Sequence, residues 1–161
     1  MDEPAIQIRN SVTDQWMSDH GFTDAARRFI HDARSRAGDR GIYGTLPPIL
    51  ILWAMLRWER KVGVLAIEKC GVDLSQLEHD TEFELESLPS VTWRDGIDLD
   101  HVKAAAKRAV EEAAQLGHNY VGSEHLVLAL TRDASDSVRR IFRKHGLSAE
   151  KYTEAVRSVL G

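Results

Sequence analysis

The chain repeats its own pattern in its two halves. Residues of the same type recur with an offset of 76 residues, as in Ala33 and Ala109, and then of 75 residues, as in Lys69 and Lys144. One inserted residue near Pro47 reconciles the two offsets. A period of about half the chain is too long for a solenoid and indicates a duplicated helical bundle. The other matched pairs are Ala37 with Ala113, Gly41 with Gly117, Ala54 with Ala129, Arg57 with Arg132, Gly71 with Gly146 and Leu85 with Leu160.

Apolar residues recur at helical spacing four times in the second copy. Gly117 is expected to end the first and longest of these helices, because glycine turns left-handed without strain. We expect Ser123 to cap the second helix and Ser148 to cap the fourth, since a serine hydroxyl accepts from the free amides of a helix start. The four apolar segments run from Val102 to Leu116, from Glu124 to about Leu130, from Val138 to Phe142 and from Tyr152 to Leu160.

The first copy repeats this order and completes the predicted fold. Residues 82–86 alternate like a strand, but the repeat favours a fourth helix from Leu74, capped by Asp73. We predict an all-α fold in which two pseudo-symmetric four-helix repeats pack as one domain. Its other apolar segments are Phe22 to Ala37, Ile49 to Leu56 and Val64 to Ile67. The expected boundaries are an extension over 1–21, a first repeat over 22–86, a linker over 87–97 and a second repeat over 98–161.

Composition narrows the class of protein. A chain of 161 residues with 43% hydrophobic content suits one compact domain. Its net charge of -4 lacks the basic excess of a dedicated nucleic-acid binder, so we expect no nucleic-acid partner. Cys70 is the single cysteine, which rules out an internal disulfide framework and fits a reducing compartment. We expect its thiol to be buried and inert.

Neither a targeting segment nor a membrane span is recognisable in the sequence. Met1 is followed by two acidic residues rather than by a basic stretch and an apolar run. The longest apolar run, residues 49–56, is far below membrane-spanning length. We therefore expect a cytoplasmic protein without a membrane partner.

One run of the second copy, Leu116-Gly-His-Asn-Tyr-Val-Gly-Ser-Glu-His-Leu-Val-Leu-Ala-Leu, carries a family resemblance. With Arg132 and Gly146 after it, and with Phe22-Thr23 opening the first copy, it resembles the repeat of the amino-terminal domain of Clp-family AAA+ unfoldases, especially the ClpC type. The resemblance covers about residues 22–161. It implies a double-repeat domain that is not an enzyme, takes no cofactor or metal, and receives substrate proteins or peptides, some of them arginine-phosphorylated, and adaptor proteins or Clp subunits.

The sequence holds no glycine-rich phosphate loop, so we expect no ATP hydrolysis by this chain itself. Two alternatives from other classes are a small hydrolase that uses Ser123 or Ser148 with a histidine, and a helical nucleic-acid-binding module. Ser148 matches a serine-lysine hydrolase pattern by letters alone, because a helix cap explains it fully.

The resemblance also implies a ligand site at the start of the second helix. In ClpC-type domains a glutamate at the position of Glu124 meets the guanidinium of a phosphoarginine, while amides near Gly122 and Ser123 and a threonine such as Thr23 hold the phosphate. Read from the residues alone, the run 123–125 is a helix start with a cap, a dipole-matched acid and a locally bonded histidine.

Neither copy keeps the whole ligand set. The first copy has Thr23, but Pro47 and Pro48 remove the N–H donors of its helix start and no glutamate stands there. The second copy has Glu124, but Asp98 or Leu99 replaces the threonine. We therefore expect at most one weakened site, located in the second copy.

Several other residues are candidates for contact with partners. Trp58 and Arg57 follow the buried second helix and Trp93 lies in the linker, and tryptophan beside arginine is typical of protein interfaces. The histidines at 101, 118 and 125 have no ligand-like spacing, so local hydrogen bonds are favoured over a metal site. The arginines at 27, 28, 34, 36 and 40 alternate with aspartates, which favours a solvated helix face or a protein-contact surface over nucleic-acid binding.

Overall fold

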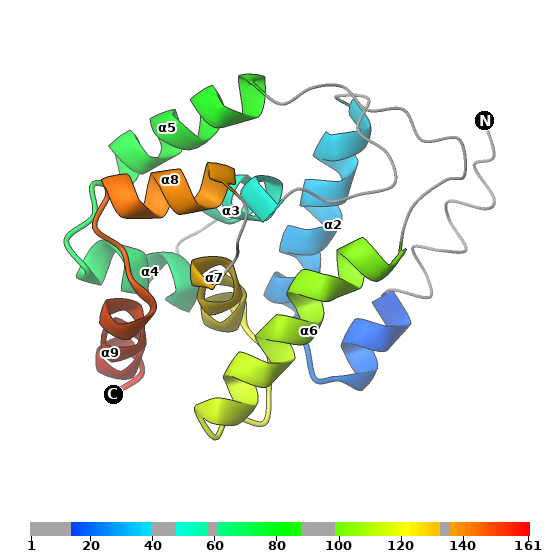
Figure 1. Cartoon of the computed structure of the whole chain (residues 1–161). Coiled ribbons are helices and arrows are strands. Elements are labelled where there is room, and N and C mark those ends of the chain that lie inside the picture. The colour runs from blue at the N-terminus through cyan, green and yellow to red at the C-terminus, as the bar shows by residue number, and fades with distance from the viewer. Residues whose placement is uncertain (1–13, 40–47, 58–60, 88–98, 133–135) are drawn as a thin grey trace.

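The computed structural model of the chain describes residues 14–39, 48–57, 61–87, 99–132 and 136–161, and of residues 99–104 and 136 it describes the backbone alone. The described residues form α-helices and no strand, apart from a single parallel bridge between Phe22 and Val121 (Figure 1). A short helix over 14–19 comes first. The others are α2 (Asp24–Asp39), α3 (Pro48–Arg57), α4 (Val62–Lys69), α5 (Leu74–Glu86), α6 (Leu99–Gln115), α7 (Ser123–Thr131), α8 (Asp136–Lys144) and α9 (Ala149–Leu160).

The helices α2 to α5 and α6 to α9 follow the same order, which confirms the predicted double repeat. Local signals position these elements as expected. The Asp73 carboxylate accepts from the amide of Ser75 at 3.0 Å, and the Ser148 hydroxyl accepts from that of Lys151 at 3.2 Å. Gly117 follows α6 with a φ of 74°, the left-handed conformation that glycine adopts most readily.

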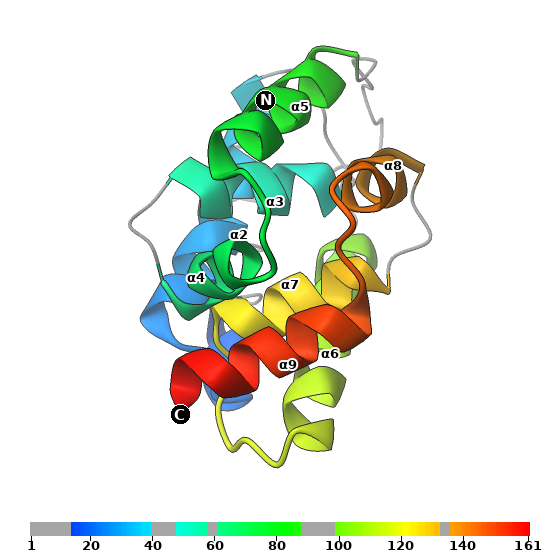
Figure 2. The same ribbon diagram turned by 90° about the vertical axis from the view of Figure 1, so that its left-hand side faces the viewer.

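The second helix of each copy lies at the centre of the molecule, so that α3 and α7 are enclosed by the other helices (Figure 2). Residues 49–52 of α3 and every residue of α7 from Ser123 to Leu130 are buried. The long helices α2 and α6 contribute only one stripe each to the core, including Phe29 and Ala109. Continuous apolar runs therefore form central helices, while amphipathic runs form the outer ones.

The two copies interlock where α4 meets the start of α7 and α9. The Ser123 hydroxyl accepts a hydrogen bond from the Gly63 amide at 2.9 Å, and the Tyr152 hydroxyl donates to the Gly63 carbonyl at 2.7 Å. A Cβ atom on Gly63 would lie 2.9 Å from the backbone of Ser123, so only glycine permits this approach. One backbone position of the first copy is thus held by two side chains of the second.

The extension before the first repeat takes part in the core, although the sequence assigned it no role. Met17 is 0% exposed and belongs to the same hydrophobic cluster as α2 and α7. The Trp16 ring stacks on His20 with centroids 4.1 Å apart and lies 5.9 Å from the ring of Phe22. The segment therefore covers part of the apolar interior of the domain.

Candidate functional site

The run 118–125, which carries the family resemblance, forms a hydrogen-bonded network at the start of α7. Gly122 is the N-cap and Ser123 the first helical residue, so the expectation that Ser123 caps this helix is wrong. The His125 Nδ1 accepts from the Gly122 amide at 2.9 Å. The Nε2 atom therefore carries the proton and donates to Nδ1 of His118 at 2.8 Å.

Burial keeps His125 neutral. Loss of hydration, reinforced by the neighbouring His118, lowers the pKa of His125 to about 4. The predicted local hydrogen bonding of His118 and His125 is confirmed. Within the described residues, no three histidine, cysteine or acidic side chains cluster in a way that would hold a metal ion.

Glu124 is turned inward rather than presented to solvent. Its Oε2 atom accepts from the Tyr120 hydroxyl at 3.0 Å, and the residue is only 2% exposed. The carboxylate folds over Gly122, where a Cβ atom would lie 2.1 Å from Oε1. Burial, together with this carboxylate, raises the pKa of Tyr120 to about 12, so the phenol stays a hydrogen-bond donor.

Thr23 of the first copy lies beside this network. The sequence did not predict this, because the ligand residues of each copy were compared separately. The Thr23 amide donates to the Val121 carbonyl at 2.9 Å, and its hydroxyl accepts from the Ala26 amide at 3.1 Å. Thr23 and Glu124 therefore come from different copies and flank the same helix start. The sequence held no signal for this, because the bridge between Phe22 and Val121 joins segments about a hundred residues apart.

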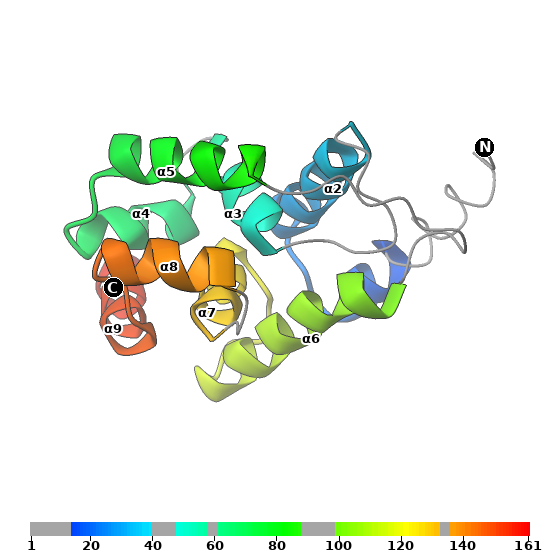
Figure 3. The same ribbon diagram turned by 45° about the horizontal axis from the view of Figure 1, so that its top comes forward.

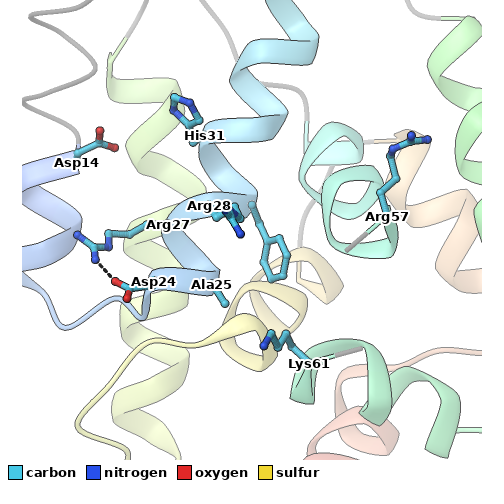
Figure 4. Close-up of a pocket in the computed structure, with 9 residues that line it drawn as sticks. Asp14, Asp24, Ala25, Arg27, Arg28, His31, Arg57 and Lys61 are labelled. Atoms are coloured by element: carbon cyan, nitrogen blue, oxygen red, sulfur yellow. Dashed lines mark hydrogen bonds and ion pairs between the residues drawn. The ribbon is translucent and has the colours of Figure 1, made fainter. Parts of the chain in front are cut away.

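A cavity, which we name the α2 pocket, lies beside α2 (Figure 4). Its other side is formed by the C-terminal end of α3 and the N-terminal end of α4. Its volume is about 910 Å³. Four of its lining side chains are cationic and two are acidic, and Arg27 pairs with Asp24. The lining residues are Asp14, Asp24, Ala25, Arg27, Arg28, Phe29, His31, Arg57 and Lys61.

Arg57, an expected protein-contact residue, lies on the rim of this pocket. Its guanidinium stands 5.1 Å from the centroid of the Trp53 ring and 3.9 Å from the Glu82 carboxylate, and its side chain is 54% exposed. Trp53 is half-buried, and its indole N–H donates to Glu82 at 2.7 Å. The other two candidates, Trp58 and Trp93, lie outside the described residues.

The arginines of α2 are not all solvated, contrary to the simpler expectation for this helix. The guanidinium of Arg36 lies 5.4 Å from the Trp53 ring centroid, and burial lowers the pKa of Arg34. Arg27 and Arg28 face the α2 pocket instead. The sequence could not predict the cation–π contact or the pocket lining, because both depend on where α3 lies.

The serines of the hydrolase alternative have other roles in this structure. The Ser123 hydroxyl is bonded to the amide of Gly63, and the Ser148 hydroxyl caps α9. Both ring nitrogens of His125 are engaged as well, by Gly122 and His118. These contacts give no support to a serine–histidine nucleophile, which requires the hydroxyl to be bonded to a free basic nitrogen.

Comparison with known proteins agrees with the double repeat. The chain matches the family model of the Clp repeat (R) N-terminal domain over residues 21–145 and again over 99–161. It is 28% identical over 144 residues to the chaperone protein ClpB of Oceanobacillus iheyensis, and 27% identical over 144 residues to the negative regulator of genetic competence ClpC/MecB of Bacillus subtilis. Both alignments cover 87% of this chain and 17% of the relative, so the chain spans a small part of these proteins.

Solved structures share the fold. The Hsp104 N-terminal domain from Candida albicans superposes with a TM-score of 0.70 at 21% identity, covering 88% of this chain and 92% of that one. The N-terminal domain of the ClpV1 ATPase from E. coli superposes with a TM-score of 0.66 at 17% identity, covering 93% and 90%. The molecule is thus a double-repeat helical domain of the Clp type. It belongs to the Clp repeat N-terminal domain family, which confirms the resemblance seen in its sequence.

None of the helices in the described part of the chain combines the length and apolar character needed to cross a membrane.

Proposed function

We propose that this domain receives substrate or adaptor proteins for a Clp-type ATPase system and hydrolyses no ATP itself. The single observation that carries the proposal is the α2 pocket, an open cavity with a cationic excess on a domain of the Clp repeat family. The described side chains hold no serine, histidine and acid in a catalytic arrangement. Binding is therefore the function that this surface supports best.

The pocket favours an acidic protein segment. Arg27, Arg28, Arg57 and Lys61 outnumber Asp14 and Asp24, and arginine forks bind carboxylates in a fixed, bidentate geometry. Phe29, whose ring is buried, also lines the pocket and provides an apolar wall for an aliphatic neighbour. The interleaved aspartates would repel a continuous phosphate backbone, so a peptide fits this pocket better than a nucleic acid does.

A finer proposal concerns phosphoarginine. Thr23, Gly122, Ser123 and Glu124 flank one helix start, and their arrangement supports one site built from both copies rather than one per copy. The hydrogen bond from Tyr120 to Glu124 must open before the carboxylate meets a guanidinium. We therefore expect weak binding that improves when this bond is removed.

The test is fluorescence anisotropy with a labelled acidic peptide, a basic peptide of the same length and a single-stranded oligonucleotide. We expect the acidic peptide alone to bind, and Arg57→Glu and Lys61→Glu each to weaken it by about tenfold, the value of a charge-assisted hydrogen bond. Arg157→Glu, at an exposed position of α9, is the matched charge control.

Three outcomes would contradict the proposal. They are acidic-peptide binding that both pocket variants leave intact, preferential binding of the oligonucleotide, and ATP turnover by the pure domain. Oligonucleotide binding that Lys61→Glu abolishes would favour the nucleic-acid alternative.

A further inference from the structure

The pseudo-symmetry of the fold is broken at one pair of helices. With the 75-residue offset, α4 of the first copy corresponds to α8 of the second, and α5 corresponds to α9. The packed pair of α5 and α8 is therefore the counterpart of the packed pair of α4 and α9. Helices α4 and α9 are joined by the buried hydroxyl of Tyr152, which reaches the Gly63 carbonyl. At the counterpart positions of α8, Val138 replaces Gly63, so the close approach that glycine allows cannot be repeated there.

Ion pairs connect α5 and α8. Arg140 donates to both carboxylate oxygens of Glu84, at 3.0 and 3.3 Å. Asp80 accepts from Lys144 at 3.1 Å and from His145 at 2.7 Å. In the second copy, Ala155 and Val159 occupy the positions equivalent to Asp80 and Glu84. Long charged side chains therefore hold α5 and α8 apart, whereas small apolar side chains at the equivalent positions allow α4 and α9 to approach each other closely. The two pairs are visible in Figure 3.

A hollow of about 480 Å³ results, which we name the α5–α8 groove. Phe83 stands on its rim and is 66% exposed, more than any other large hydrophobic side chain among the described residues. Buried Ile141 lines the groove between the ion pairs. An aromatic ring held in water costs hydrophobic free energy that burial by a partner would recover.

The charge of the groove indicates what fits it. Glu84 and Asp80 are already engaged by Arg140 and Lys144. Arg143 also lines the groove, so that three cationic side chains face two carboxylates in its described lining. The rim therefore carries one uncompensated positive charge beside one exposed aromatic ring.

We propose that the α5–α8 groove is a second docking surface, which binds an acidic segment of a partner protein that inserts an apolar side chain beside Phe83. A carboxylate of that segment pairs with Arg143, and its apolar side chain packs on Phe83 and Ile141. The surface goes beyond the α2 pocket, with which it shares no lining residue. One domain would then hold two protein segments at once.

The probe is a short synthetic peptide with leucine and glutamate on one helical face, used with two matched peptides that carry alanine for leucine or glutamine for glutamate. It is titrated into the 15N-labelled chain and followed by amide chemical shifts. We expect the parent peptide to shift the amides of Phe83, Ile141 and Arg143, and each matched peptide to bind more weakly.

Variants of the chain separate the two sites. Phe83→Ala should weaken binding at the groove by about tenfold, as for a central aromatic anchor, and Arg143→Glu by about fivefold, as for an exposed ion pair. Both side chains are exposed, so the fold should persist, which an unchanged thermal melt verifies. Leu160→Ala and Arg157→Glu, exposed positions of α9, are the matched controls.

Lys61→Glu should leave the shifts of Phe83 and Arg143 unchanged, since it alters only the α2 pocket. Groove binding that survives both Phe83→Ala and Arg143→Glu overturns this inference and leaves the α2 pocket untouched as a proposal. Shifts confined to the lining of the α2 pocket would overturn it as well.

Discussion

Replacing Gly63 by alanine sets two physical effects of opposite sign against each other. Within a helix, alanine is favoured over glycine by about 1 kcal/mol, so helix propensity alone predicts a more stable protein. The new Cβ would, however, lie 2.9 Å from the Cβ, carbonyl carbon and carbonyl oxygen of Ser123. Two of these atoms are backbone of buried α7 and cannot rotate away.

The packing loss should exceed the propensity gain. Overfilling a close-packed contact costs about 1–3 kcal/mol. Moving α4 away from α7 also stretches the bonds that Ser123 and Tyr152 make to Gly63, each worth about 1 kcal/mol. The balance is a loss of about 2 kcal/mol, which lowers the Tm of a domain of this size by about 5 °C.

Urea denaturation followed by far-UV circular dichroism, together with a thermal melt, measures this loss. We expect the midpoint of the Gly63→Ala variant to fall while its m-value stays unchanged. A variant that is more stable than the wild type would refute the reasoning, because it would mean that helix propensity prevails and that the approach of α4 to α7 is not tight.

Three further outcomes follow from the buried polar groups. Tyr152→Phe should lower the unfolding free energy by about 1–2 kcal/mol in urea denaturation, because the Gly63 carbonyl loses its donor; an unchanged midpoint would contradict this. In titrations with a phosphoarginine peptide, Glu124→Ala should weaken binding by about ten- to a hundredfold, whereas Tyr120→Phe should strengthen it by freeing the carboxylate; Glu124→Ala binding as well as the wild type would reject the site. Folding lowers the pKa of His125 from 6.5 to about 4. The neutral ring therefore contributes about 3 kcal/mol to the free energy of unfolding above pH 6.5, and this contribution is lost as the pH falls toward 4. His125→Gln should flatten the stability profile between pH 7.5 and pH 4.5, and equal losses in both proteins would exclude His125 as the cause.

The sequence by itself determined the elements of this protein and their order. Helical periodicity, the Asp73 and Ser148 caps and the left-handed turn at Gly117 are local, since each depends on residues within a few positions along the chain. The duplication extended this local information, because it identified α5 as a helix although residues 82–86 alternate like a strand. The family followed from the same runs of residues.

The tertiary structure decided what the polar side chains do. Ser123 looks like a cap from its neighbours, yet its hydroxyl serves Gly63, which lies sixty residues away. From its neighbours Glu124 is expected to face solvent, yet it is buried and accepts from Tyr120. Thr23 lies beside the start of α7 because the bridge between Phe22 and Val121 joins the copies there.

The α2 pocket and the α5–α8 groove likewise follow from how the helices approach each other, within the first copy for the pocket and between the two copies for the groove. Sequence periodicity shows which face of a helix is apolar, but the distance between two helices depends on side chains far apart in the chain, such as Gly63 in one pair and the ion pair of Arg140 with Glu84 in the other. Hydrogen-bond partners and cavities depend on that distance, and for this reason only the folded chain fixes them.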